Sequence, residues 1–237
     1  MINKKHFVQI LEKINLDKNV EQCILSIQNN KLHARFSNST SSFIGEINSV
    51  LELTDVKIPI YELSSLLKLL KILDNENINI DFESMGGILE KMLIHDVNYK
   101  LTFRLCDPFL IPEAKKTRHI EYNETFNLSP DIIDKFIKSK KSLDKEIDKF
   151  VISSDGVDTK IILGGNNDFY NKIEFILGPS SSKGEAVFNS DLFKSILENN
   201  SVFTEAQLSI NYQGIICLKF LGDYNIESTY YVVADKN

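Results

Sequence analysis

The chain has 237 residues, of which 43% are hydrophobic and 25% are charged, and its formal net charge is −6. This composition is typical of a folded globular protein and argues against a disordered chain. It has no apolar run long enough to span a bilayer and no apolar N-terminal stretch of the signal-peptide kind, so we expect a cytoplasmic protein without a membrane partner.

The first half predicts two helices among several strands. Residues 3–15 predict a helix that Asn3 caps and whose apolar stripe is Phe7, Ile10, Leu11 and Ile14. A second helix is expected at 62–73. The expected strands are 23–27, 32–36, 43–53, 56–60, 78–82, 89–94 and 99–105.

Between the two halves the alternation of apolar and polar residues stops. Pro108 and Pro112 disfavour strand pairing, and residues 113–118 are polar and mostly basic. We therefore expect a connector at 107–125, between a first domain at 1–106 and a second at 126–237.

The second half repeats the order of the first. Ser129-Pro130-Asp131 is a strong helix start, and the helix is expected to run to about residue 142. A fourth helix is expected at 190–198, capped by Asn189 or Ser190. The expected strands are 150–153, 160–163, 169–177, 185–188, 207–212, 215–220 and 228–234.

The two halves also share apolar positions at one fixed offset. Phe7, Ile10 and Leu11 recur 126 positions later as Ile133, Phe136 and Ile137, and the helix around Lys68 recurs around Lys194. One offset that fits two helical patterns indicates a duplicated domain. The predicted fold class is α+β, with two similar domains of antiparallel sheet, each backed by two short helices.

The candidate reactive residues form no recognisable active site. His6, His33, His95 and His119 are scattered, without the spacing of a zinc site, and no nucleophile or phosphate-loop motif is present. Cys23, Cys106 and Cys217 lie far apart in apolar runs, which favours buried free thiols over redox or metal use. We expect no enzymatic activity, no metal and no cofactor.

The predicted helices are basic although the chain as a whole is acidic. They carry ten lysines and six acids, a net charge of +4, which leaves −10 for the remainder. Several of the acids fall in first turns, where the helix dipole favours them for structural reasons. A basic layer on an acidic body indicates an anionic partner met on one face. The alternative is that these lysines are ordinary solvated residues.

These lysines predict contacts with the phosphates of a nucleic acid and no sequence-specific contacts with its bases. Lysine contacts phosphate as a point charge, and the helices have no arginine or amide clusters suited to paired contacts with base edges. Such binding would be independent of DNA sequence and would weaken steeply with salt.

Two segments, together with the order of elements, resemble a known family. The chain resembles the DNA sliding clamps, and most closely the clamps of T-even-type phages. The first similar segment is Ile60 to Asn75 with the following strand Ile78–Phe82. The second is Tyr230-Tyr231-Val232-Val233-Ala234. The resemblance covers the whole chain in the order of its elements but is specific only in these short runs.

The resemblance implies a DNA clamp fold and a ring of three subunits with the helices around duplex DNA. The clamp would tether the replicative DNA polymerase, would be loaded by a separate clamp loader, and would act in the host cytoplasm if phage-encoded. The residues that would face DNA are Lys4, Lys5, Lys13, Lys68, Lys71, Lys135, Lys138, Lys141 and Lys194.

The resemblance also implies a pocket for the C-terminal peptide of the polymerase. Its matching residues are Phe43, Ile44, Phe109, Leu110, Ile111, Val233 and Ala234. The apolar connector residues among them can equally well serve to pin the connector to the body of the protein.

Two other functions remain open from the sequence. One is a monomeric DNA-binding processivity or accessory factor that does not encircle DNA, and the other is an enzyme of unknown type on an α+β scaffold. The mass in solution separates a trimeric clamp from a monomeric factor.

Overall fold

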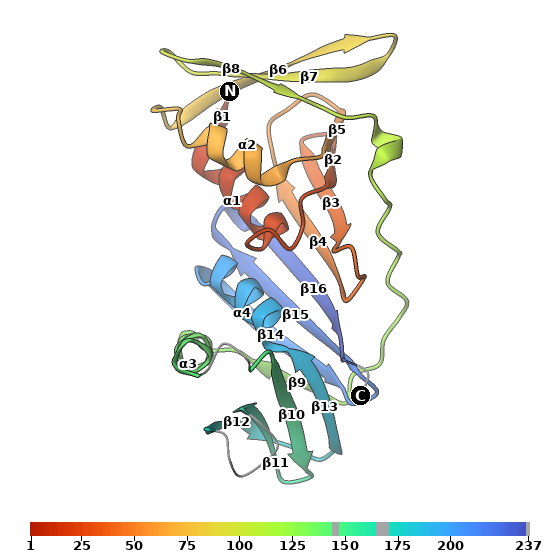
Figure 1. Ribbon diagram of the computed structural model, residues 1–237, viewed down its shortest axis with the longest axis vertical. Coiled ribbons are helices and arrows are strands. Elements are labelled where there is room, and N and C mark those ends of the chain that lie inside the picture. Colours follow the sequence, from red (N-terminus) through yellow and green to blue (C-terminus); the bar gives the residue numbers. More distant parts are fainter. Residues whose placement is uncertain (144–146, 165–170, 236–237) are drawn as a thin grey trace. The chain divides into compact units, whose positions relative to one another are not determined.

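The computed structural model describes residues 1–143, 147–164 and 171–235, which form two compact units. Unit 1 consists of Met1–Lys116 together with Gly222–Ser228, and unit 2 consists of Thr117–Leu221 together with Thr229–Asn237. The division falls within the connector expected at 107–125. Each unit has two α-helices and its own set of strands (Figure 1).

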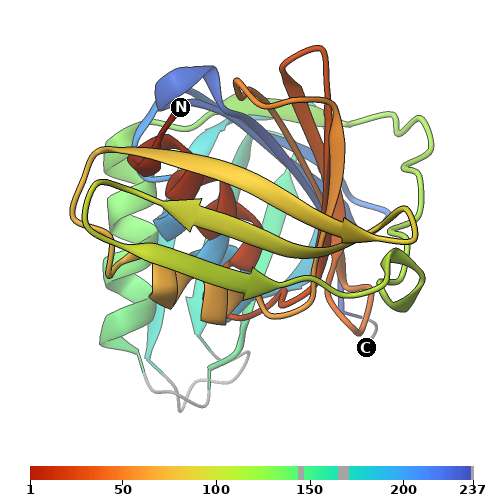
Figure 2. The ribbon, with the colours of Figure 1, turned by 90° about the horizontal axis from the view of Figure 1, so that it is seen from above.

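Unit 1 contains two helices and two antiparallel sheets (Figure 2). The strand orders are β5-β2-β3-β4 in one sheet and β1-β6-β7-β8 in the other. A 3-10 helix, Pro108–Leu110, follows the last strand. The elements are β1 (Ile2–Asn3), α1 (Lys4–Asn15), β2 (Cys23–Gln28), β3 (Lys31–Ser37), β4 (Phe43–Val50), β5 (Val56–Ile60), α2 (Leu63–Leu70), β6 (Asn77–Met85), β7 (Ile88–His95) and β8 (Lys100–Arg104).

Unit 2 has the same set of elements. Its strand orders are β13-β10-β11-β12 and β9-β14-β15-β16. A 3-10 helix at Asp223–Asn225, which belongs to unit 1, lies between β15 and β16. The elements are β9 (Glu124–Asn127), α3 (Pro130–Ser142), β10 (Lys149–Asp155), β11 (Asp158–Gly164), β12 (Lys172–Pro179), β13 (Lys183–Asn189), α4 (Ser190–Asn199), β14 (Phe203–Asn211), β15 (Ile215–Gly222) and β16 (Glu227–Val233).

The two strand orders correspond element by element, which confirms the predicted fold class. Each unit pairs its strands as two antiparallel sheets and packs one helix of the pair against the other. The helices α1 and α3 begin at Lys4 and Pro130, as the offset of 126 residues predicts. A duplicated domain of this kind repeats each local signal, because every element must bury the same face.

Local capping explains where three of the helices begin. The Asn3 side chain accepts a hydrogen bond from the His6 N–H (3.0 Å), and Asn189 accepts one from the Leu192 N–H (2.8 Å). The Ser129 hydroxyl accepts one from the Ile132 N–H (3.3 Å), and Pro130 occupies the first turn of α3. These side chains satisfy N–H groups that have no partner within the helix.

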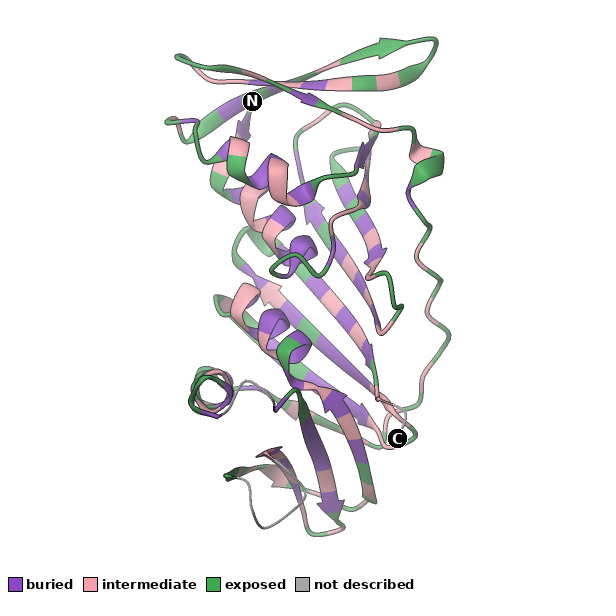
Figure 3. Cartoon of the chain, in the orientation of Figure 1, coloured by how far each residue is buried: buried purple, intermediate pink, exposed green. Residues whose placement is uncertain are grey.

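The buried residues lie on one face of each helix and alternate along the strands (Figure 3). Phe7, Ile10, Leu11 and Ile14 of α1 are fully buried, as their spacing predicts. The core of unit 2 is more aromatic: Phe136 makes edge contacts with Phe150 and Phe193, with ring centroids 5.3 and 4.7 Å apart. Such contacts stabilise aromatic pairs beyond their area burial.

The structure differs from the expected elements in several places. Strands β1 and β9 were not expected, because each is very short and exists only through its pairing with β6 or β14. The helix α2 ends at Leu70, earlier than residue 73. Cys23 and Cys217 are buried free thiols as predicted, but Cys106 lies beyond β8 and is only half-buried. The first residues of the strand expected at 169–177 lie outside the described residues.

Candidate functional site

The helices of unit 1 run antiparallel, which brings three lysines to one end of the pair. The Lys4 ammonium group at the start of α1 donates a hydrogen bond to the Leu73 carbonyl beyond the end of α2. At the other end, the Asn15 amide donates to the Ser64 hydroxyl, 3.2 Å away. Lys5 therefore lies near the end of α2 that carries Lys68 and Lys71.

Lys5, Lys68 and Lys71 are exposed and uncompensated. In the part of the chain that the structure describes, no carboxylate lies within ion-pair distance of these three ammonium groups. The first turns of α1 and α2 also carry no acid. This end of the helix pair therefore presents positive charge that is free to meet an anion.

Lys13 and Lys4, two of the predicted DNA contacts, have structural positions instead. Lys13 is 5% exposed, and burial lowers the pKa of its ammonium group to about 8, although the carboxylates of Asp223 and Glu12 oppose the shift. Lys4 is half-buried and bonded to the Leu73 carbonyl. We therefore leave Lys13 out of the candidate DNA face and assign Lys4 mainly to the α1–α2 contact.

The lysines of α3 are exposed but ion-paired. The ammonium groups of Lys135 and Lys138 lie 2.7 and 2.5 Å from the carboxylates of Asp131 and Asp134, one helical turn earlier. The hydrogen bond and the charge of Asp134 raise the pKa of Lys138. Each pair has no net charge at neutral pH.

A second set of ion pairs ties α3 to α4. Glu198 accepts from both Lys141 (2.8 Å) and Lys194 (3.4 Å). Partial burial opposes ionisation of Glu198, but hydrogen bonds and charge from these two lysines hold its pKa below the usual range.

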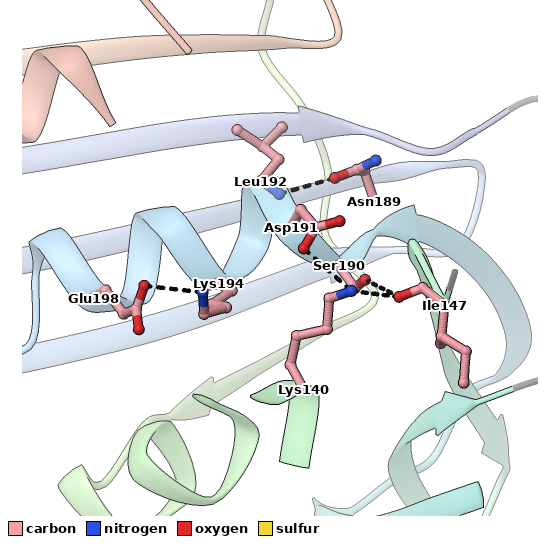
Figure 4. A network of polar contacts seen from close by, with 8 residues as sticks. All are labelled: Lys140, Ile147, Asn189, Ser190, Asp191, Leu192, Lys194 and Glu198. Carbon is pink, nitrogen blue, oxygen red and sulfur yellow. Dashed lines mark hydrogen bonds and ion pairs between the residues drawn. The ribbon is translucent and has the colours of Figure 1, made fainter. Parts of the chain in front are cut away.

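Lys140 is buried at the junction between α3 and α4, so its role is structural (Figure 4). Its ammonium group donates to the Ile147 carbonyl and lies 3.1 Å from Asp191 in the first turn of α4. The Ser190 hydroxyl donates to the same Ile147 carbonyl, 3.2 Å away. These contacts satisfy a buried charge, which would otherwise be very unfavourable.

The residues expected to form a peptide pocket have different environments in the structure. Phe43 is fully buried and packs against Phe36 with centroids 6.3 Å apart, so it is a core residue. Its neighbour Ile44 lines a groove of about 500 Å³. The other residues that line this groove are Lys18–Gln22, Ser37–Ser39, Ser41, Pro112, Glu113 and Lys115.

The three apolar connector residues have different environments. Phe109 is 97% exposed on the 3-10 helix, whose start is capped by the Asp107 carboxylate at 3.0 Å from the Phe109 nitrogen. Leu110 is exposed and borders a groove between α2 and β8. Ile111 is 6% exposed and anchors the connector to unit 1. Ile111 therefore has the anchoring role considered for this segment, and Phe109 is accessible to solvent.

Val233 and Ala234 lie at the end of β16 in unit 2. Val233 is exposed, and the Ala234 N–H donates to the Gly214 carbonyl at 2.8 Å. Val233 is therefore open to a partner, whereas the backbone of Ala234, just past the end of β16, is held by this hydrogen bond.

Sequence reasoning missed the loops that line the groove beside Ile44. Residues 38–41 follow β3 and are rich in serine and asparagine, which is typical of a loop, so their closeness to Ile44 in the sequence was available as a signal. Residues 18–22 reach the groove only through tertiary packing, and nothing local marks them.

The described residues hold no other obvious functional centre. None of their helices is long and apolar enough to cross a membrane. No group of three or more metal-binding side chains occurs among the same residues.

The topology of the two units defines a DNA clamp fold of the PCNA type. The chain is similar to the PCNA of A. fulgidus bound to the C-terminal region of FEN-1, with a TM-score of 0.79, 12% identity, and 100% and 99% of the two chains covered. It is also similar to Proliferating Cellular Nuclear Antigen from Entamoeba histolytica, with a TM-score of 0.74, 14% identity, and coverage of 99% and 96%.

A third similar structure is the PCNA2–PCNA3 complex from Sulfolobus tokodaii, with a TM-score of 0.69, 16% identity, and 99% and 97% of the chains covered. No protein-family model and no curated protein sequence matches the chain. At these identities the likeness establishes the fold alone.

Proposed function

We propose that this chain is the subunit of a DNA sliding clamp that encircles duplex DNA and tethers the replicative polymerase. The observation that carries the proposal is the duplicated clamp fold of an acidic chain whose helices are basic. The exposed lysines of these helices would hold phosphates weakly and without sequence preference, and a closed ring would supply the persistence of binding. No enzymatic step is required of the chain.

The proposed ring is a homotrimer closed by edge strands. The strands β8 and β12 each lie at the outer end of a four-stranded sheet in their own unit. An exposed edge carries unpaired N–H and C=O groups that a strand of another chain can pair. A head-to-tail contact of this kind generates a closed ring when the rotation between subunits permits it.

The proposed protein partners are a polymerase peptide and a clamp loader. The A. fulgidus PCNA structure contains the C-terminal region of FEN-1, which supports peptide binding as a property of the fold. In this chain the groove beside Ile44 and the exposed Phe109 are the candidate contacts for the C-terminal peptide of the polymerase. A T-even-type phage origin, with action in the host cytoplasm, also belongs to the proposal.

The decisive test combines mass and topology. A trimer by light scattering, retained on nicked circular DNA after loading and released when that DNA is linearised, supports the clamp. A strict monomer that binds linear and circular DNA equally well overturns it in favour of a DNA-binding accessory factor. The circular and linear DNAs have the same sequence and length, so only threading distinguishes them.

A further inference from the structure

We propose that the two helix pairs contribute unequally to DNA binding. Lys5, Lys68 and Lys71 make the main phosphate contacts, whereas Asp131 and Asp134 cancel the charges of Lys135 and Lys138, and Glu198 offsets one of the two charges of Lys141 and Lys194. This inference rests on the proposed clamp function and assigns roles within its DNA face. It gives the three acids a function, namely to limit how strongly the second helix pair holds DNA.

The charges of the two pairs differ although their folds correspond. Within the bounds of the helices, α1 and α2 carry four lysines and one acid, whereas α3 and α4 carry five lysines and four acids. All five lysines of α3 and α4 have a carboxylate partner, at distances of 2.5 to 3.4 Å. Duplication has kept the helices and changed their electrostatics.

The cancellation does not depend on strong ion pairs. An exposed pair of this kind contributes about 1 kcal/mol or less, so Lys135 or Lys138 can turn away from its partner at little cost. The carboxylate nevertheless stays one turn away on the same helix and repels an approaching phosphate. The pair as a whole therefore attracts DNA weakly wherever the ammonium group points, and it displaces few counterions.

Helix stability alone does not require these acids. Acids in a first turn interact favourably with the helix dipole, which is the structural alternative for Asp131, whereas Asp134 lies beyond the first turn of α3. However, α1 has the corresponding place in the fold and no acid in its first turn, where the Asn3 cap suffices. Glu198 lies outside the first turn of α4, so the dipole does not explain it.

Two helix pairs with unequal affinity for DNA would suit a ring that must move along the duplex. Fewer uncompensated lysines displace fewer counterions from the phosphates, so the total attraction between the ring and the duplex stays weak. The chain would then regulate its own grip through Asp131 and Asp134.

The test measures the salt dependence of DNA affinity for two matched lysine variants. Fluorescence anisotropy with a short linear duplex, at about 50 to 200 mM salt, gives the slope of log K against log salt. The K68A/K71A variant should bind more weakly with a shallower slope, reduced by about one for each lysine that had bound a phosphate. The D131N/D134N/K135A/K138A variant, which removes the same number of lysines together with their paired acids, should stay within about twofold of the wild type.

A variant that is expected to bind DNA more tightly provides the second part of the test. The D131N/D134N variant should bind DNA several-fold more tightly and steepen the slope, because Lys135 and Lys138 become uncompensated. The control is E52Q/E227Q, which removes two exposed acids outside the helices and should bind like the wild type. Circular dichroism melting of each variant verifies that it remains folded.

The outcomes separate this inference from the clamp function. An equal reduction of slope in the two lysine variants, or an unchanged D131N/D134N affinity, overturns the inequality and leaves the clamp function standing. If neither lysine variant changes the slope of the wild type, the DNA face itself is wrong and this inference falls. A wild type that is not retained on nicked circular DNA overturns the clamp function, and with it this inference.

Discussion

The imidazole ring of His6 stacks on the phenol ring of Tyr224, with centroids 4.7 Å apart and an interplanar angle of 16°. His6 lies in α1 and Tyr224 in the segment Gly222–Ser228, which belongs to unit 1 although it follows most of unit 2 in the sequence. The Nε2 atom of His6 lies 2.9 Å from the Ser49 hydroxyl. The stack and this hydrogen bond fasten the late segment and β4 to α1.

The first prediction concerns Tyr224, which holds the late segment on α1. Replacing it with Ala should destabilise the protein by about 1–2 kcal/mol, because the variant has no ring to stack on His6 and buries less apolar area. Urea denaturation at neutral pH measures the change. Tyr224→Phe keeps the ring and should behave like the wild type; an equal destabilisation in both variants would assign the effect to the hydroxyl group instead of the stack.

The second prediction concerns the loss of stability at acidic pH that His6 causes. Burial lowers the pKa of His6, so the unfolded state takes up a proton at a higher pH than the folded state does. Stability should therefore fall as the pH drops below about 6.5, and level off below the folded pKa. The difference in unfolding free energy between wild type and His6→Gln, measured from about pH 8 to pH 5, isolates this contribution. A difference that does not vary with pH contradicts it.

The third prediction concerns the rise in stability at alkaline pH that the buried Lys13 causes. Its pKa of about 8 is lower than that of an unfolded lysine, so the unfolded state binds more protons between about pH 8 and pH 10.5. Stability from this group should rise across that window by up to about 3 kcal/mol. Lys13→Met should abolish the rise and be the more stable protein at pH 7. Exposed Lys68→Met is the matched control and should retain the rise.

The fourth prediction concerns Glu124, which joins β9 to neighbouring strands of unit 2. Its carboxylate accepts hydrogen bonds from the Thr159 and Tyr212 hydroxyls at 2.6 and 3.1 Å, from the Ser182 N–H at 3.2 Å, and from the Ser180 hydroxyl. Burial raises the pKa of Glu124, but these bonds outweigh it and the net pKa is low. This stability is present above the ordinary glutamate pKa of about 4.5 and is lost as the pH falls through the folded value.

Glu124→Gln should therefore cost about 1–2 kcal/mol at neutral pH and flatten the acid limb of the stability curve. Thermal melting between about pH 7 and pH 3 measures both effects. The variant Glu121→Gln alters an exposed side chain three residues earlier and serves as the control. Identical acid limbs for Glu124→Gln and wild type would show that the carboxylate is not the titrating group.

The fifth prediction separates binding from anchoring in the connector. Phe109→Ala should leave the melting temperature unchanged, because the ring is 97% exposed, and should weaken binding of the polymerase peptide about tenfold or more. Ile111→Ala should instead lower stability, since this side chain is buried. Calorimetric titration with the peptide measures binding. Val157→Ala, an exposed apolar change on a turn of unit 2, is the control.

Tight peptide binding by Phe109→Ala would place the contact elsewhere along the groove. Ile44→Ser then becomes the informative variant, because Ile44 lines that groove without being part of the core.

Helix starts could be predicted from the sequence because their signals are local. Asn3, Ser129 and Asn189 each cap a helix through N–H groups three residues ahead, and the apolar spacing that follows defines the buried face. The duplication added a second, independent copy of each signal. Strand β9 had no such support, since it is polar at Glu124, Thr125 and Asn127 and is a strand only beside β14.

The environments of the lysines could not be predicted in the same way. Helical spacing indicates which side of a helix is polar, but Lys13 and Lys140 are covered by segments distant in sequence or by a neighbouring loop. The pairing of Lys141 with Glu198 joins residues from two different helices. Counting charges along the helices therefore predicts the sign of the net charge on the helical surface but not where on that surface the uncompensated charges lie.

The segment Gly222–Ser228 also bears on synthesis of the chain. The ribosome synthesises α1 first and this segment near the end. The contacts of His6 with Tyr224 and of Lys13 with Asp223 can therefore form only when synthesis is nearly complete. A nascent chain can form the sheets of unit 1 early, but its first helix stays incompletely covered until the last part of the message has been read. Factors that shield nascent chains would therefore meet this protein at its beginning, on the surface that its own late residues eventually occupy.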